Sequence, residues 1–169
     1  MLSLTRKTDY ALVALSFLGH RQVAEEGPAS ARLIADTYKL PLPLLMNILK
    51  ELSSSGLLTS TRGATGGYVL AKEPAEISIL DVIEAIEGPL RVALCANDME
   101  SPACNCTIQD KCPIRKPVRN LHLKFADFLA STSLQDLLEG SKFATDQECQ
   151  DCSCEQEIAV GSSANENAL

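Results

Sequence analysis

Residues 41–71 have the sequence PLPLLMNILKELSSSGLLTSTRGATGGYVLA, and this stretch decides the fold. Pro43 suits the first turn of a helix, because the N–H that proline lacks would have no intrahelical partner there. Apolar residues then recur at helical spacing and predict a helix that runs to about Ser53 and ends before Gly56. The stripe expected to be buried consists of Leu45, Ile48, Leu49 and Leu52. Two β-prone runs surround the glycine-rich turn 63–67, a pattern that predicts a β-hairpin.

Two more helices are predicted before this stretch. Dense apolar residues between Thr5 and His20 indicate a well-buried helix, and Ser30 can cap a second helix that reaches Leu40. The order helix, helix, turn, helix, hairpin is typical of a winged helix-turn-helix, whose third helix enters the major groove of DNA. We therefore expect a mainly α fold with a small β-hairpin wing.

A long helix is predicted in the second half of the chain. Before it, Ser78 and Asp81 form a capping-box pattern that opens a helix ending at Gly88. Prolines fit only near a helix start, so the long helix is expected from about Pro113 to Ala130, with a short helix over 131–138 behind it. One face of the long helix is apolar, and we expect it to pair with its twin in a homodimer. This face consists of Val118, Leu121, Phe125, Phe128 and Leu129.

These elements divide the chain into three expected parts. Residues 1–90 form the winged helix-turn-helix, and 91–140 form a cysteine-containing loop with the dimerisation helix. Polar residues dominate 141–169, and such a segment cannot bury enough apolar surface to offset chain entropy. We expect 141–169 to be a disordered acidic tail, and its Cys149, Cys152 and Cys154 to be adventitious thiols rather than a metal site.

Composition restricts the class of protein. The chain lacks a signal-peptide pattern and any run of 18 apolar residues, so we expect a cytoplasmic protein with no membrane partner. Net charge is −7, but residues 1–67 carry seven Lys and Arg against five Asp and Glu, whereas 141–169 carry one against six. The acidity is thus concentrated in the tail and leaves DNA binding open. No nucleophile and base pair stands out, so we expect neither an enzyme nor a small-molecule substrate.

The predicted third helix and hairpin carry residue types that recognise double-stranded DNA. Asn47 can read adenine with two hydrogen bonds, and Lys50 suits a phosphate. Arg62 at the hairpin tip can enter a narrow minor groove. The hydroxyls that can donate to the DNA backbone are those of Thr59, Ser60 and Thr61. Taken singly, each segment also fits a plain core helix or tight turn. A phosphate cradle at 63–67 is not favoured, because no helix follows it.

The cysteine loop has the pattern Cys95-x8-Cys104-x-Cys106-x5-Cys112. Thiolates on loops suit tetrahedral zinc or the iron of an iron-sulfur cluster. Neither two-plus-two CxxC spacing nor a paired His is present, so the pattern is a poor zinc ribbon.

Three segments resemble the iron-sulfur cluster regulator family of winged-helix transcription factors. They are LTRKTDYALVAL at 4–15, RGATGGY at 62–68 and ILDVIEAI at 79–86, and the likeness extends over residues 1 to about 140. The family includes nitric-oxide-sensitive repressors and regulators of cluster assembly operons. The resemblance implies a repressor that binds palindromic promoter DNA, with control of cluster assembly genes as the first expectation.

The resemblance also implies a ligand set for a 2Fe-2S cluster. Three cysteines hold the cluster in that family, and Cys95, Cys106 and Cys112 occupy the matching positions. One branch adds a His three residues after the last cysteine, but Arg115 stands there and its cation cannot ligate iron. Another branch uses an acidic residue from the first helix of the partner subunit, and Asp9 matches it. Cys104 competes as fourth ligand, with His122 behind it; Asp9 also fits a first-turn carboxylate that stabilises the helix dipole.

Two other functions remain open from the sequence. A repressor of the same fold can respond to thiol oxidation or to zinc without any cluster. An iron-sulfur carrier can use the same cysteines without binding DNA.

Overall fold

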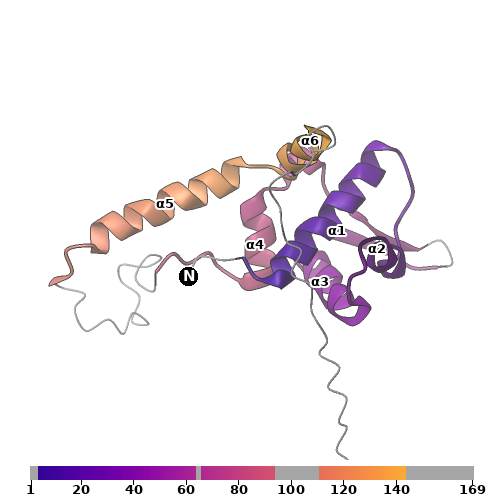
Figure 1. Ribbon diagram of the computed structural model, residues 1–169, viewed down its shortest axis with the longest axis horizontal. Helices are drawn as coiled ribbons and strands as arrows, with labels where there is room; N and C mark the ends of the chain where they lie inside the picture. Colours follow the sequence, from indigo (N-terminus) through magenta and orange to yellow (C-terminus); the bar gives the residue numbers. More distant parts are fainter. Residues whose placement is uncertain (1–3, 64–65, 94–110, 144–169) are drawn as a thin grey trace, which may run out of the picture.

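A computed structural model describes residues 4–63, 66–93 and 111–143, with side chains described to residue 140. It confirms a mainly helical chain with a two-stranded hairpin, and the helices of residues 4–93 form one body (Figure 1). The elements are α1 (Arg6–Val23), α2 (Ala31–Tyr38), α3 (Leu42–Ser54), β1 (Leu58–Thr61), β2 (Gly67–Leu70), the 3₁₀ turn η1 (Pro74–Glu76), α4 (Ile79–Glu87), α5 (Arg115–Ser131) and α6 (Leu134–Phe143). No helix in these ranges is long and apolar enough to cross a bilayer.

The helix starts follow the predicted caps. The Ser30 hydroxyl accepts a hydrogen bond from the Leu33 N–H at 3.1 Å and so caps α2. Ser78 and Asp81 satisfy each other's backbone N–H groups at the start of α4, as a capping box requires. Lys39 adopts a left-handed conformation with φ of 53°, which turns the chain sharply from α2 into α3.

The core lies between α1 and α3. All four residues of the predicted α3 stripe, Leu45, Ile48, Leu49 and Leu52, are 0% exposed. Ala11, Ala14 and Leu15 of α1 are equally buried in the same cluster. Small alanines on α1 let the α3 leucines approach closely, and this burial fixes which side of α3 faces outward.

The hairpin is held to the helical body through residue 29. β1 and β2 pair antiparallel with Leu58 opposite Leu70 and Thr61 opposite Gly67. Ala29 and Tyr68 exchange backbone hydrogen bonds of 3.1 and 2.9 Å, which adds a third extended segment beside β2. A Cβ at position 67 would lie 2.5 Å from the Ala29 carbonyl oxygen, so this close approach requires glycine.

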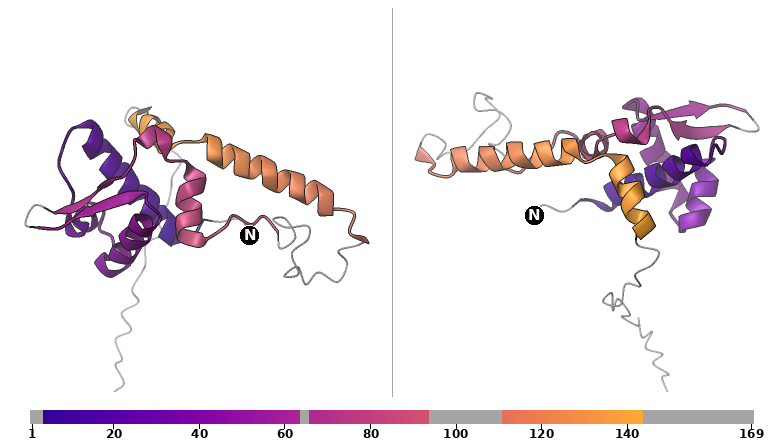
Figure 2. Two further views of the ribbon diagram at one scale, coloured as in Figure 1. Left: turned by 180° about the vertical axis from the view of Figure 1, so that it is seen from behind. Right: turned by 90° about the horizontal axis from the view of Figure 1, so that it is seen from above.

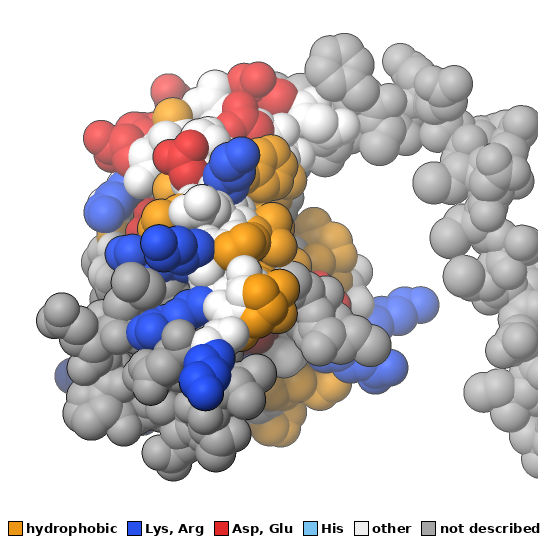
Figure 3. All heavy atoms as spheres, turned by 90° about the vertical axis from the view of Figure 1, so that its left-hand side faces the viewer, with side chains coloured by type: hydrophobic (Ala, Val, Ile, Leu, Met, Phe, Trp, Pro, Cys, Tyr) orange, Lys and Arg blue, Asp and Glu red, His pale blue; other side chains and the backbone are white. Residues whose placement is uncertain are grey.

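Helix α5 projects away from the body. It begins at Arg115, two residues after the predicted start at Pro113, and extends outward (Figures 1 and 2). Viewed from that side, hydrophobic side chains are exposed next to a row of Lys and Arg side chains (Figure 3). Within the described residues, its last turns pack inward, where Leu129 joins a cluster with Ile79 and Ile83 of α4 and Phe125 packs against that cluster.

Helix α6 differs from the prediction in both position and length. It begins at Leu134 rather than residue 131, because Ser133 and Asp136 form the cap there. It ends at Phe143, so residues 141–143 are helical and the prediction of a disordered tail from 141 is wrong for them. Leu134 and Leu138 are buried in the same core as α1 and α3. Gly19 leaves room for Leu138, since a Cβ there would come within 2.8 Å of its Cδ1.

The first turn of α1 is held by a carboxylate from α4. Thr5 is the N-cap residue, but its side chain makes no capping bond. Instead, Glu87 accepts hydrogen bonds from the Thr5 N–H at 3.0 Å and from the hydroxyl of the fully buried Thr8. The Thr8 hydroxyl first, and then the Thr5 N–H, hold the pKa of Glu87 below its ordinary value. The negative charge also complements the positive end of the α1 dipole.

The Glu87 anchor predicts a pH-dependent stability. Because the pKa of Glu87 is lower in the folded chain, its stabilisation is complete above the ordinary value of 4.5 and is lost as pH falls through the folded-state pKa. Glu87→Gln should lower the free energy of unfolding at neutral pH, and the difference from wild type should shrink in acid. Urea denaturation over a pH series measures this. Glu84→Gln, an exposed glutamate of the same helix, is the control, and a difference that stayed constant with pH would refute the anchor.

Candidate nucleic-acid interface

The outward side of α3 carries the two base- and phosphate-reading residues expected from the sequence. Asn47 and Lys50 are exposed, on the side opposite the buried leucine stripe. Met46 is 52% exposed one turn before Lys50, and its apolar tip suits the C5-methyl of a thymine. The outer side of α3 therefore offers a polar, a cationic and an apolar group to a DNA groove.

The hairpin presents the remaining predicted DNA contacts. Leu58 of β1 is buried, whereas Thr59, Ser60, Thr61 and the following Arg62 are exposed. The Thr61 hydroxyl also lies 3.3 Å from the Gly67 N–H and 3.4 Å from its carbonyl oxygen, so it helps to close the hairpin. This second role leaves the hydroxyls of Thr59 and Ser60 as the better candidates for phosphate contacts.

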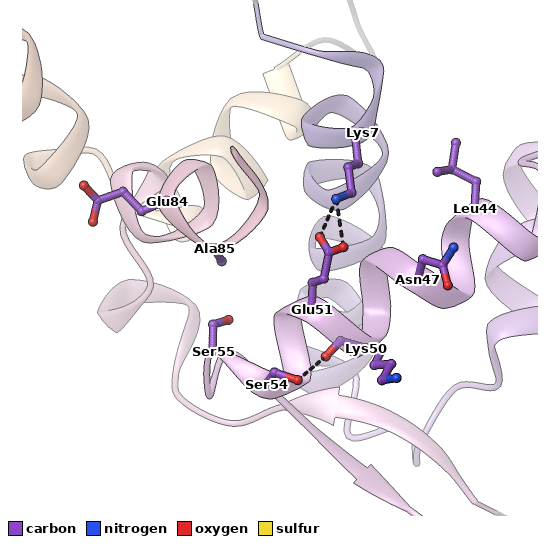
Figure 4. A pocket seen from close by; sticks show the side chains of 9 residues that line it. All are labelled: Lys7, Leu44, Asn47, Lys50, Glu51, Ser54, Ser55, Glu84 and Ala85. Atoms are coloured by element: carbon purple, nitrogen blue, oxygen red, sulfur yellow. Dashed lines mark hydrogen bonds and ion pairs between the residues drawn. The ribbon is translucent and has the colours of Figure 1, made fainter. Parts of the chain in front are cut away.

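A groove of about 670 Å³ runs along α3 (Figure 4). It brings Asn47 and Lys50 together with a lysine from α1 and with side chains of α4. The wing residues 59–62 do not line it. Its lining consists of Lys7, Leu44, Asn47, Lys50, Glu51, Ser54, Ser55, Glu84 and Ala85.

Lys7 and Glu51 form an ion pair across this groove that the sequence analysis missed. The Lys7 Nζ atom lies 2.8 and 2.6 Å from the two carboxylate oxygens of Glu51. Each side chain is about one-third exposed, and a pair in that setting contributes at most about 1 kcal/mol. A phosphate can therefore compete with Glu51 for the Lys7 ammonium. The two residues are 44 positions apart, and no local pattern relates them.

The structure places only part of the predicted cluster site. Cys95, Cys104 and Cys106 lie outside the described residues. Cys112 is partly buried just before α5, and Asp9 is exposed in the first turn of α1. Within the described ranges, no three His, Cys, Asp or Glu side chains gather closely enough to hold a metal ion.

The positions of the described donors bear on how a cluster would fit. The start of α5, which Cys112 precedes, lies at the end of that helix farthest from α1 in both views (Figures 1 and 2). This arrangement is compatible with the expectation that Asp9 would come from the partner subunit. The Nδ1 atom of His122 is buried without a hydrogen-bond partner in the described part of the chain, so His122 keeps its place as a candidate. Thiolate, carboxylate and imidazole are all donors that iron accepts.

Comparison with known proteins identifies relatives over most of the chain. The family model for Rrf2, described as an iron-dependent transcriptional regulator, matches residues 4–140. IscR of Photorhabdus laumondii is 30% identical over 82% of this chain and 80% of its own length. CymR of Bacillus subtilis is 33% identical over 80% and 89%, and NsrR of Shouchella clausii is 28% identical over 81% and 89%. All three are HTH-type transcriptional regulators.

Solved structures give the same fold. CymR, the global cysteine regulator of B. subtilis, superposes with a TM-score of 0.63 at 31% identity, covering 83% of this chain and 98% of its own. IscR of T. potens superposes with a TM-score of 0.62 at 27% identity, covering 85% and 90%.

Substitutions on α3 should separate base reading from phosphate binding. Asn47→Ala should weaken binding to a duplex selected from a random pool by roughly 1–3 kcal/mol and relax its preference at one base pair. Lys50→Ala should weaken binding to all duplexes alike. It should also reduce the magnitude of the slope of log affinity against log salt by roughly 0.9, the value for one lost phosphate contact. Fluorescence anisotropy at several salt concentrations measures both.

Two matched variants control this experiment. Asn120→Ala on α5 and Lys72→Ala after the hairpin remove exposed side chains of the same types, Asn and Lys, at positions outside α3. If all four variants bound DNA as wild type does, α3 would not be the DNA-reading helix.

Proposed function

The chain belongs to the Rrf2 family of transcriptional regulators, and from this premise we propose that it is a cytoplasmic homodimeric repressor controlled by a 2Fe-2S cluster. The observation that carries the proposal is the position of Cys112: a soft ligand directly before a helix whose apolar side is uncovered in one chain. Such a ligand lies where two subunits would meet. Cluster chemistry and subunit arrangement would then be linked at one place.

DNA recognition in this proposal uses α3 and the wing. Asn47 and Lys50 approach the major groove, Thr59 and Ser60 the backbone, and Arg62 the minor groove. Two-fold symmetry places two α3 helices one DNA turn apart, so the operators are palindromic. Cluster assembly genes are the first expected targets, in line with the IscR relatives.

The dimer contact in this proposal is the seam of α5. Its apolar residues follow spacings of four and three, as in a coiled coil, and are Ile114, Val118, Leu121, Phe125 and Phe128. Ile114, Leu121 and Phe128 are 60%, 56% and 62% exposed. A helix with such a stripe buries it against another element, and a second copy of α5 offers the matching surface.

The cluster ligands we propose are Cys95, Cys106 and Cys112, with the fourth ligand either Asp9 from the other subunit or Cys104. His122 ranks behind these two. Three thiolates provide the soft donor set that iron-sulfur clusters use. When bound, the cluster would respond to oxidation, to the availability of iron or to nitric oxide. IscR and NsrR relatives support this assignment.

The first turn of α1 can couple such a site to the DNA-reading helix. Asp9 stands in this turn, directly after Lys7, which pairs with Glu51 of α3, and Thr8, which contacts Glu87 of α4. A shift of Asp9 therefore moves a turn that is tied to both helices. If this turn has two arrangements that differ in DNA affinity, a cluster that changes their populations would change the affinity of the protein for DNA.

A thiol-responsive repressor without a cluster is the second candidate. It is favoured by the CymR relatives, one of which is a global cysteine regulator. Zinc at the same thiols is a further version of it. A carrier that never binds DNA is less well supported, because the relatives named above are transcriptional regulators.

The seam of α5 predicts a dimer that one substitution separates. Leu121→Asp places a charge in the seam and should give a monomer in sedimentation equilibrium, with operator binding weakened and no longer cooperative. Leu123→Asp is a matched control, because Leu123 is similarly exposed, at 52%, on the opposite side of α5. If Leu121→Asp remained dimeric, the proposed seam would be wrong.

The cluster predicts coloured protein after anaerobic purification. Wild type should contain iron and sulfide with visible absorption, and Cys95→Ala, Cys106→Ala and Cys112→Ala should each lose them. Cys104→Ala and Asp9→Ala distinguish the fourth ligand, since only the true ligand should alter the visible spectrum. A variant with Cys149, Cys152 and Cys154 all changed to Ala is the control and should keep its colour. Colourless protein without iron or sulfide, with DNA affinity that responds to oxidation, would favour the second candidate.

A further inference from the structure

The N-terminal half of α5 and the residues before it hold the densest positive charge in the chain. Five of the 15 Lys and Arg residues lie within 111–124, and no Asp or Glu lies among them. The first turn of α5 contains no acidic residue. These cations are Lys111, Arg115, Lys116, Arg119 and Lys124.

This charge is unfavourable for the helix itself. Cations oppose the positive end of the helix dipole, and Arg115 and Arg119 are like charges one turn apart. Each such placement costs a few tenths of a kcal/mol, roughly. Lys116, Arg119 and Lys124 form no ion pair with any residue in the described ranges. An anion that approaches this end of α5 would remove the cost.

The basic side of α5 stays accessible when the seam is covered. Helical spacing places Lys116 and Arg119 on the side away from Leu121 and Phe125. Lys116, Arg119 and Lys124 are all exposed. The exposed Leu123 lies on the side of Lys116 and Arg119, whereas Lys124, five residues after Arg119, lies nearer the seam. In Figure 3, which views the molecule from the left-hand side of Figure 1, Lys and Arg side chains lie beside hydrophobic side chains. The surface therefore offers both charge and an apolar contact.

The same chain carries an anionic segment of matching charge. Residues 144–169 contain six Asp and Glu and no Lys or Arg, and they follow the family match, which ends at 140. Four of the six, Glu148, Asp151, Glu155 and Glu157, stand among the cysteines at 149, 152 and 154. The segment has 26 residues, and a random-coil chain of that length would span roughly 30 Å on average, comparable to the length of α5. Tethering gives it a local concentration of about 1 mM.

We propose that the acidic segment 144–169 docks on the basic face of α5, which consists of Lys116 and Arg119, one helical turn apart, with Lys124 at its edge beside the seam. The DNA-facing groove is a poorer partner, because its Lys7 and Lys50 are interspersed with Glu51 and Glu84. Docking places the tail thiols near Cys112 at the start of α5. The interaction depends on neither DNA nor a cluster.

Zero-length cross-linking tests the docking on the full chain without DNA. A carbodiimide joins a carboxylate to an amine only when the two are in contact, and mass spectrometry then identifies the linked residues. We expect links from Lys116 and Lys124 to Glu148, Asp151, Glu155 or Glu157, and their loss in 1 M salt, where the screening length is about 3 Å.

Arg119→Glu reverses the charge of the face and leaves both reporter lysines in place, so it should abolish the links. Arg32→Glu, an exposed arginine on helix α2, is the matched control and should preserve them. Links concentrated on Lys39 and Lys50 would place the segment on the DNA-binding side and overturn the proposal. Links spread evenly over all exposed lysines, or none at all, would overturn it as well.

Discussion

The burial of one side of α3 against α1 is the constraint on which the rest of the helical body of residues 4–93 (below, the head) depends. Leu45, Ile48, Leu49 and Leu52 are fully buried, and a helix with that stripe inside has only one rotation about its axis. That rotation turns Asn47 and Lys50 outward. The hairpin is then placed beside α3 by the backbone bonds between Ala29 and Tyr68. The exposure of these candidate DNA-contact residues thus follows from core packing and needs no contact between them.

Helix α5 differs from α3, because much of its apolar side is exposed: Leu121 and Phe128 are 56% and 62% exposed. Phe125 and Leu129 pack on α4, but Leu121 and Phe128 do not. A rigid helix that is anchored at one end and uncovered along its seam carries the cysteine loop at its free end. If a second copy covered the seam, its residues would also lie beside Cys112. The core of α1 to α4 is therefore closed within one chain, whereas the α5 region would be completed by the proposed dimer.

Local signals predicted most of the head. Caps at Ser30 and Ser78 and the leucine stripe of α3 act within a few residues, so they can be read from the sequence. Contacts between distant positions could not be predicted from local sequence patterns. Glu87 holds Thr8 across 79 residues, Lys7 meets Glu51 across 44, and Leu138 returns to Gly19 in the core. The exposure of Asn47 and Lys50 could be predicted because it follows from the stripe, and their contact with DNA stays a prediction. Cys95, Cys104 and Cys106 lie outside the described residues.

Charge distribution explains how a chain of net charge −7 can serve as a DNA-binding regulator. At physiological salt the screening length is about 8 Å, so a phosphate responds to charges on the surface it contacts and not to the total. Six of the 22 acidic residues lie in 144–169, beyond the family match. Free in solution, that segment would repel DNA whenever it approached α3. Held on the basic face of α5, it would neutralise side chains that form no ion pair within the described residues, and it would leave the α3 groove to the phosphates.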